Sequence, residues 1–226
     1  MSGSACHQAA VALRQAILEK AEQILGGEAA IADGVVRLVD GGGGDMPLAD
    51  LAPLRAEGSF ESTGTAFTYG ACAARVEVDA ETGSIRLLQL AVAVDAGFAI
   101  NPEVVRGQLL GAAAHGIGGA LFEQLDYGED GEPQTGGLRD YHVPLAADLP
   151  DVKAVVLELV PSTRNPLGVR GVGEIATAGA AAAIANAVAD AVAGRRIAVT
   201  ALPILPEHLI LLSVRGHTGT AVRVDR

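Results

Sequence analysis

The sequence predicts an α+β fold, because helical and strand patterns are mixed along the chain without strict alternation. Residues 5–25 carry apolar side chains at three-and-four spacing, which is typical of an amphipathic helix. Residues 67–95 hold two strand-like runs joined by a turn, and residues 178–192 are rich in alanine, a strong helix former. A chain of 226 residues can hold two compact units, and we expect them over residues 1–95 and 96–226.

The first predicted unit opens with the helix over 5–25, with Ser4 as its expected N-cap and Gly26-Gly27 ending it. A short hairpin is expected over 31–39, with Asp33-Gly34 at its turn. A glycine loop follows at 40–45, and it lacks the Lys-Ser/Thr ending of a phosphate-binding loop. A short helical turn is expected over 46–54.

A second hairpin is expected from strands 67–79 and 84–95. The first strand alternates, so one of its faces is solvated, whereas 87–94 is apolar on both faces and predicts a central strand. A glycine-rich helix over 102–125, a polar loop over 128–137, a strand over 152–160, a helix ending near Gly194 and a terminal helix over 206–212 follow. Each interior glycine costs a helix about 0.5–1 kcal/mol against alanine, so the glycines of the first of these helices indicate close approach of its backbone to something.

Charge and cysteine content exclude several classes of protein. Lys and Arg total 16 against 27 Asp and Glu, a net charge of −11, which argues against a nucleic-acid partner. No run of 18 uninterrupted apolar residues and no basic, signal-like N-terminus is present, so we expect a cytoplasmic protein with no membrane partner. Cys6 and Cys72 are the only cysteines, and an iron–sulfur cluster needs about four ligands, so this chain holds none.

The most informative segment is Asn165-Pro-Leu-Gly-Val-Arg-Gly-Val-Gly-Glu174, which runs into the alanine-rich helix. Its glycines let the backbone bend and approach a ligand, and Glu174 stands where free N–H groups of a helix start face outward. A carboxylate beside an anion-binding backbone indicates a reaction centre. The alternative is structural, since the helix dipole alone favours an acid at this place.

A series of spaced motifs runs over residues 95–192: Asp95-Ala-Gly-Phe-Ala-Ile-Asn-Pro102, Gly107-Gln108 with Gly111, His115-Gly-Ile-Gly118, Leu121-Phe-Glu123, Asp140-Tyr141 with Pro144, Asn165-Pro-Leu-Gly168 and Gly171-Val-Gly-Glu174. In this order they resemble the molybdenum-binding large subunit of the molybdenum hydroxylases, the family of xanthine dehydrogenase, aldehyde oxidase and aerobic carbon monoxide dehydrogenase. Upstream, Ala66-Phe-Thr-Tyr-Gly70 and Val76-Glu-Val-Asp79 are also similar. Their number and order make the resemblance far more specific than any one motif.

The resemblance implies the C-terminal cofactor-binding fold of these enzymes and oxidative hydroxylation of an aldehyde or N-heterocycle, with water as the oxygen source. Molybdenum would be held by the dithiolene of a pterin, which in this family is often in its cytosine dinucleotide form, with no protein ligand to the metal. Glu174 is implied as the catalytic base, and its chemistry requires a carboxylate that is ionised yet poorly solvated. The implied cofactor-binding residues are Gln108 with Gly107; Asp95, Ala96, Ala99 and Asn101; Gly171, Val172 and Gly173; and Ser2, Gly3 and Ser4.

Some of these positions keep a structural alternative. Gln108 is also compatible with a solvent-facing helix position, Asp95 with a turn-forming residue ahead of Gly97, and the N-terminal residues with a disordered end. Arg170 has two interpretations, steering of an anionic substrate or pairing with a nearby acid.

The chain is several times shorter than the large subunits it resembles. We therefore expect either a fragment or one part of a split subunit, acting in a hetero-oligomer on a small-molecule substrate. Its partners would be the missing N-terminal half, an iron–sulfur subunit with 2Fe-2S clusters and an FAD subunit. The alternative is a non-catalytic fragment or assembly module that retains the fold only. A flavin or nicotinamide binder is disfavoured, since no Gly-x-Gly-x-x-Gly turn follows a first strand.

Overall fold

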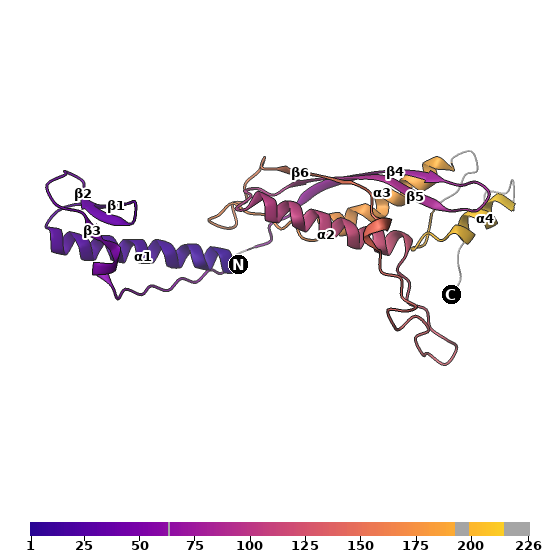
Figure 1. The fold of residues 1–226 in the computed structure, drawn as a ribbon, viewed down its shortest axis with the longest axis horizontal. Helices are drawn as coiled ribbons and strands as arrows, with labels where there is room; N and C mark the ends of the chain where they lie inside the picture. The colour runs from indigo at the N-terminus through magenta and orange to yellow at the C-terminus, as the bar shows by residue number, and fades with distance from the viewer. Residues whose placement is uncertain (63, 193–198, 215–226) are drawn as a thin grey trace. The chain divides into compact units, whose positions relative to one another are not determined.

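The computed structural model describes residues 1–62, 64–192 and 199–214. The chain divides into two compact units, one of residues 1–65 with 163–168 and one of residues 66–162 with 169–226 (Figure 1). The predicted boundary after residue 95 instead lies inside the larger unit. The reason is that the strand ending at Asp95 pairs on one side with an earlier strand and on the other with a later one.

The smaller unit is built on helix α1 (Ser2–Leu25), which confirms the predicted helix. The helix ends where Gly26 adopts a left-handed φ of 76° and donates its N–H to the Glu22 carbonyl. Ser4 is not the N-cap that we expected. The helix begins at Ser2, and Ser4 is a buried residue of its first turn.

A three-stranded antiparallel sheet packs on α1 through a small apolar core. Its strands are β1 (Ala29–Ala32), β2 (Val35–Leu38) and β3 (Met46–Pro47), and the short 3-10 helix η1 (Leu48–Leu51) follows. The β1–β2 turn is Asp33-Gly34 as predicted, with both residues at positive φ. Ala21, Ala29, Val36 and Leu51 form the buried centre.

The larger unit contains a second three-stranded sheet in the order β4-β5-β6. Strands β4 (Tyr69–Val78) and β5 (Ile85–Asp95) form the predicted antiparallel hairpin. Strand β6 (Val152–Leu157) lies parallel to β5 on its other side, so β5 is central, as its apolar character on both faces predicted.

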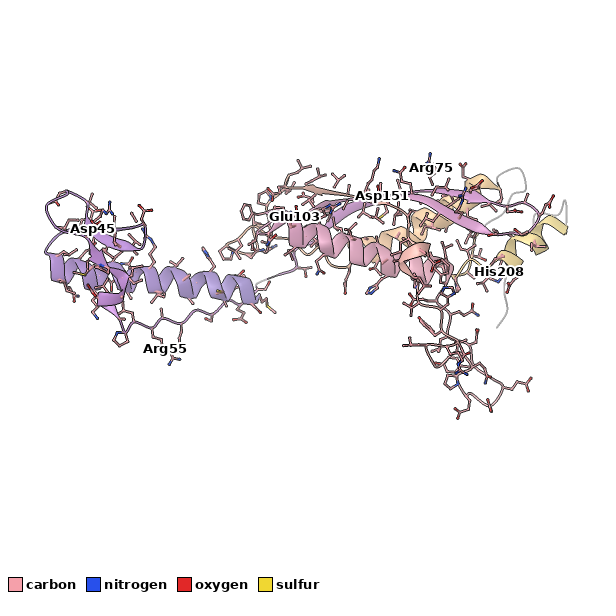
Figure 2. All side chains as sticks on the ribbon, in the orientation of Figure 1. Asp45, Arg55, Arg75, Glu103, Asp151 and His208 are labelled. Atoms are coloured by element: carbon pink, nitrogen blue, oxygen red, sulfur yellow. The ribbon has the colours of Figure 1, made fainter. Side chains whose placement is uncertain are left out.

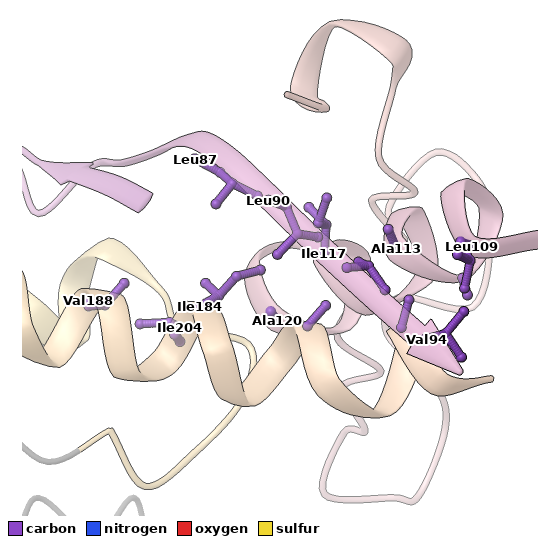
Figure 3. Close-up of a cluster of buried hydrophobic side chains, with 14 of the residues drawn as sticks. Leu87, Leu90, Val94, Leu109, Ala113, Ile117, Ala120, Ile184, Val188 and Ile204 are labelled. Carbon is purple, nitrogen blue, oxygen red and sulfur yellow. The ribbon is translucent and has the colours of Figure 1, made fainter. Parts of the chain in front are cut away.

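Helices α2 (Pro102–Leu121) and α3 (Ile175–Ala191) pack against this sheet and each other, and α4 (Pro206–Val214) follows them. A short 3-10 helix, η2 (Ala146–Asp148), precedes β6. Figure 3 shows how side chains of β5, α2 and α3 meet in the main core, where Leu90, Val94, Leu109, Ile117 and Ile184 are almost fully buried. The end predicted for the third helix near Gly194 lies outside the described residues. Among the residues described, no helix has the length and apolar character needed to cross a membrane.

Candidate functional site

The predicted site segments lie together at one end of the larger sheet, where β4 begins and β5 and β6 end. This end of the sheet is called its edge below. Tyr69 at the start of β4 pairs with Asp95 at the end of β5, and Asp95 pairs in turn with Leu157 at the end of β6. Helix α2 begins seven residues after Asp95 in the chain, and the start of α3 lies against β4, because a Cβ added at Gly70 would lie 2.7 Å from Cγ1 of Ile175. The loop after β5, the start of α2 and the turn before α3 therefore share this edge. Glu103, labelled in Figure 2, marks the first turn of α2.

Gln108 and the glycine turn before α3 come together. A Cβ built on Gly173 would lie 3.5 Å from Oε1 of Gln108, although the two residues are 65 positions apart in sequence. The predicted cofactor contact and the residue directly before Glu174 thus border one another. Gln108 is exposed, and Gly107 and Gly111 beside it on α2 have no described atom within 4 Å of an added Cβ. This part of α2 presents bare backbone and one amide side chain to solvent.

Glu174 stands at the N-cap position of α3, with φ −115° and ψ −5°. Its carbonyl accepts the N–H of Ala178, but its carboxylate makes no capping hydrogen bond among the described residues. The carboxylate is exposed in this chain, whereas the implied base would need a poorly solvated environment. The structural alternative, in which the helix dipole alone favours an acid here, does not depend on a capping bond and is compatible with this position at the start of α3.

The Asp95 carboxylate is hydrogen-bonded to backbone N–H groups of the protein itself. It is buried and accepts backbone N–H groups from Gly97 at 3.0 Å, Leu159 at 3.2 Å and Val160 at 3.1 Å. The first of these bonds is the turn-forming contact of the structural alternative. The other two tie the loop after β5 to the segment after β6, so this side chain organises the loop from within.

The remaining loop residues are also held internally. The N–H of Ala96 donates to the Leu157 carbonyl, and the N–H of Ala99 donates to the Glu158 carboxylate at 2.6 Å. Asn101 is the N-cap of α2, with Oδ1 accepting the N–H of Val104 at 3.1 Å. The side chains of Asp95 and Asn101 would therefore have to exchange these internal partners before they could bind a ligand.

Ser2, Gly3 and Ser4 belong to the smaller unit, in the first turn of α1. Helix residues stand where a loop or a disordered end was expected, and Ser4 is buried there. The other predicted residues, Gly171 and Val172, lie in the turn before α3 with Gly173. Val172 packs against the main core, while Gly171 is exposed and its carbonyl accepts the Thr68 hydroxyl at 2.6 Å.

The sequence did not predict the contacts that Arg170 makes in the structure. Its Nε donates to the Val160 carbonyl at 2.7 Å, and a terminal nitrogen donates to the Phe67 carbonyl. No ion pair among the described residues includes Arg170, so pairing with a nearby acid is not observed. The acceptors are main-chain carbonyls, which any residue type carries, so no signal in the sequence marks them.

The model of the molybdopterin cofactor-binding domain family matches residues 1–150. The chain belongs to the molybdopterin-binding family of the molybdenum hydroxylases. Among relatives of this family, it is 40% identical over 160 residues to the 6-hydroxypseudooxynicotine dehydrogenase complex subunit gamma of Paenarthrobacter nicotinovorans. That match covers 71% of this chain and 20% of the relative. It is 38% identical over 207 residues to "Probable hypoxanthine oxidase XdhD" of Escherichia coli K12, covering 84% of this chain and 21% of the relative.

A solved member of the family gives the same result for the fold. Quinoline 2-oxidoreductase from Pseudomonas putida 86 superposes with a TM-score of 0.80 at 29% identity, covering 90% of this chain and 28% of that one. The α+β architecture expected for a molybdenum hydroxylase cofactor-binding part is thereby confirmed. The chain spans about a fifth of the length of the two relatives named above.

Proposed function

We propose that this chain supplies the base and part of the cofactor cradle of a molybdenum hydroxylase acting on an aldehyde or N-heterocycle, with water as the oxygen source. The observation that carries the proposal is the approach of Gln108 to Gly173, directly before Glu174. It brings two motifs of the resemblance, which are far apart in sequence, to one edge of the sheet.

The residues at this edge fit a molybdopterin. The Gln108 amide both donates and accepts, as the edge of a pterin requires, and its exposed side chain is available for that contact. The bare backbone at Gly107 and Gly111 leaves room for a flat group to approach α2. The first N–H groups of α3 favour an anionic group beside them. Gly171, Val172 and Gly173 would add backbone contacts.

When bound, the molybdenum centre supplies the two-electron redox chemistry, which no side chain of this chain offers. The chain's own contribution to the reaction is proton transfer at one carboxylate. Glu174 would accept the proton that the attacking oxygen of water loses as it bonds to the substrate carbon. The C–H bond of that carbon would break in the same oxidation, and its two electrons are those that the redox group would take up. Its exposure in this chain means that the rest of the subunit would have to cover it, which would make it a stronger base by removing water.

The whole enzyme needs more than this chain. We propose that it acts with the remaining part of the molybdenum subunit and with 2Fe-2S and FAD partners that carry electrons away, in a cytoplasmic hetero-oligomer. The word "complex" in the name of its gamma-subunit relative supports an assembly of this kind. The cytosine dinucleotide form of the cofactor also belongs to the proposal, as do contacts of the Asp95–Asn101 loop and of Ser2, Gly3 and Ser4 with its nucleotide end.

Co-expression with the neighbouring genes tests the proposal. The purified complex is analysed for molybdenum and assayed on aldehydes and N-heterocycles, alongside Glu174→Gln and the control Glu129→Gln, an exposed acid of the 128–137 loop. We expect bound molybdenum in all three and a kcat about 10²–10⁴-fold lower only in Glu174→Gln. A complex that contains this chain but no molybdenum would instead favour a non-catalytic assembly module. Full turnover by Glu174→Gln would remove Glu174 from the mechanism.

A further inference from the structure

The Gly171–Glu174 turn contains two glycines, so its own residues restrain its backbone weakly. A carboxylate that acts as a base must nevertheless be held in a defined place, since small displacements of a catalytic group are costly. Something outside the turn has to hold it. Arg170, the residue directly before the turn, has the contacts to do so.

We propose that Arg170 is a positioning residue that clamps the Glu174 turn to the ends of all three strands of the larger sheet. The inference rests on the function proposed above for Glu174. Two contacts of the guanidinium carry it: Nε donates to the carbonyl of Val160, after β6, and a terminal nitrogen donates to the carbonyl of Phe67, before β4. The charged group therefore bridges the two outer strands of the sheet.

The third strand is joined through the backbone. The N–H of Arg170 donates to the carbonyl of Ala96, the first residue after β5, at 2.9 Å. On the other side of the clamp, the Thr68 hydroxyl donates to the carbonyl of Gly171 at 2.6 Å. The backbone is thus held by hydrogen bonds at residues 170 and 171, immediately before Val172 and Gly173. From there Val172 enters the core and Glu174 begins α3.

The guanidinium also lies against an aromatic ring. Cζ of Arg170 is 5.2 Å from the ring centroid of Tyr69, within the range of a cation–π contact. Its charge is directed at two carbonyls and this ring, all from the protein. These contacts favour a clamp over steering of an anionic substrate, because two of the five guanidinium N–H groups already donate to carbonyls of the protein.

Arginine suits this role better than lysine. Its planar fork holds several N–H groups in fixed directions and reaches two carbonyls at once, whereas a lysine ammonium is a single point with a flexible stem. Arg170→Lys should therefore keep the charge and one attachment, and Arg170→Ala should lose both. The two variants separate the effect of charge from the effect of the fork.

Hydrogen exchange of the chain tests the clamp without any cofactor. Backbone amides of residues 171–176 should exchange at least about tenfold faster in Arg170→Ala than in the original chain, with an intermediate rate in Arg170→Lys and unchanged rates in β5. The control is Arg75→Ala, which removes an exposed arginine from β4 (Figure 2). Equal exchange of residues 171–176 in the Arg75 and Arg170 variants would overturn the clamp, whatever Glu174 does.

Kinetics of the molybdenum-loaded complex test what the clamp holds. We expect Arg170→Ala to lower kcat about 10–100-fold with KM and molybdenum content little changed, and Arg170→Lys to restore part of the loss. In the Glu174→Gln background the same substitution should have almost no further effect, because the group it positions is gone. Fully additive losses would show that Arg170 acts independently of Glu174 and would overturn the positioning role. Normal turnover by Glu174→Gln alone would refute the proposed function, while the exchange experiment would still decide the clamp.

Discussion

Gly116 of α2 lies directly against Ala180 of α3. A Cβ added at Gly116 would be 2.7 Å from the Cβ of Ala180 and 3.1 Å from the carbonyl oxygens of Ala176 and Thr177. Both helices carry small residues at this crossing, so their backbones approach closely, and the Thr177 hydroxyl donates to the Ala112 carbonyl across it at 3.0 Å. This contact fixes the distance between the helices that carry Gln108 and Glu174.

Gly116→Ala should therefore destabilise the protein, because the added methyl group has no space unless the helices separate. We expect a loss of about 1–3 kcal/mol in the free energy of unfolding, measured by urea denaturation. Gly119→Ala on the same helix is the matched control. Its added Cβ meets no described atom within 4 Å, so it should gain roughly 0.5–1 kcal/mol from helix propensity. Equal effects of the two substitutions would contradict the close packing.

Gln108→Leu should lower the affinity for molybdopterin without lowering stability. The side chain is exposed and makes no described hydrogen bond inside the chain, so its removal costs the fold little, whereas a cofactor contact would be lost. We expect about a tenfold or greater fall in bound pterin, measured by fluorescence after oxidative release, with a stability change within about 0.5 kcal/mol. Gln23→Leu, at an exposed position of α1, should retain the cofactor. Full pterin content in Gln108→Leu would remove this residue from the cradle.

Tyr141 and Glu123 form a pair that responds to pH. The Tyr141 hydroxyl donates to the Glu123 carboxylate at 2.7 Å, and this hydrogen bond raises the pKa of Tyr141 above its ordinary 10.0, assisted by partial burial and by repulsion from the carboxylate. A raised folded pKa stabilises the protein fully below the unfolded pKa, and the contribution is lost as pH rises through the folded value.

The Glu123→Gln variant should therefore lower the pKa of Tyr141 towards 10.0. The measurement is the tyrosinate absorbance between neutral and strongly alkaline pH, with Tyr141→Phe to identify which transition belongs to this residue. The stability difference between Glu123→Gln and the original chain should shrink above the folded pKa. An unchanged pKa in Glu123→Gln would show that the pair does not form in solution.

The two cysteines should differ in reactivity. Cys6 is exposed, whereas Cys72 is partly buried, and burial raises its pKa above the ordinary 9.0, so less of it is the reactive thiolate at neutral pH. Iodoacetamide should label Cys6 at least about tenfold faster than Cys72, as followed by peptide mass spectrometry.

Sγ of Cys72 also lies 2.7 Å from where a Cβ at Gly179 would stand. Gly179→Ala should therefore disturb this packing and speed the labelling of Cys72, and no change would argue against the contact.

The local elements could be predicted from sequence because their signals are local. Alternation in residues 67–79 and the apolar character of 87–94 predicted the β4–β5 hairpin and its central strand, and Asp33-Gly34 predicted the turn between β1 and β2. The end of α1 followed from glycine in the same way. Its start did not, because Ser4 resembles an N-cap in sequence but is buried in the first turn.

The glycines of α2 show what these local sequence signals could not predict, namely which positions are closely packed. The interior glycines of α2 suggested close approach as a group, yet Gly116 meets α3 and Gly118 meets Glu123, while Gly107, Gly111 and Gly119 have free space. A glycine signals that a side chain is absent, and only the neighbours in space show whether something fills the gap. The division of the chain into two units could likewise not be predicted from the sequence, because it depends on the pairing of β6 with β5, which lie far apart along the chain.

The sequence by itself determined the helix and strand types, the family motifs and the choice of Glu174 and Gln108, because residue type and spacing along the chain express these directly. Only the tertiary structure decided that Gln108 borders Gly173, that Asp95 is used by its own loop and that Arg170 reaches Val160 and Phe67. The contacts of Asp95 and Arg170 join distant segments through backbone N–H and carbonyl groups. Such groups are the same at nearly every position, so the order of the residues carries no mark of which of them will meet.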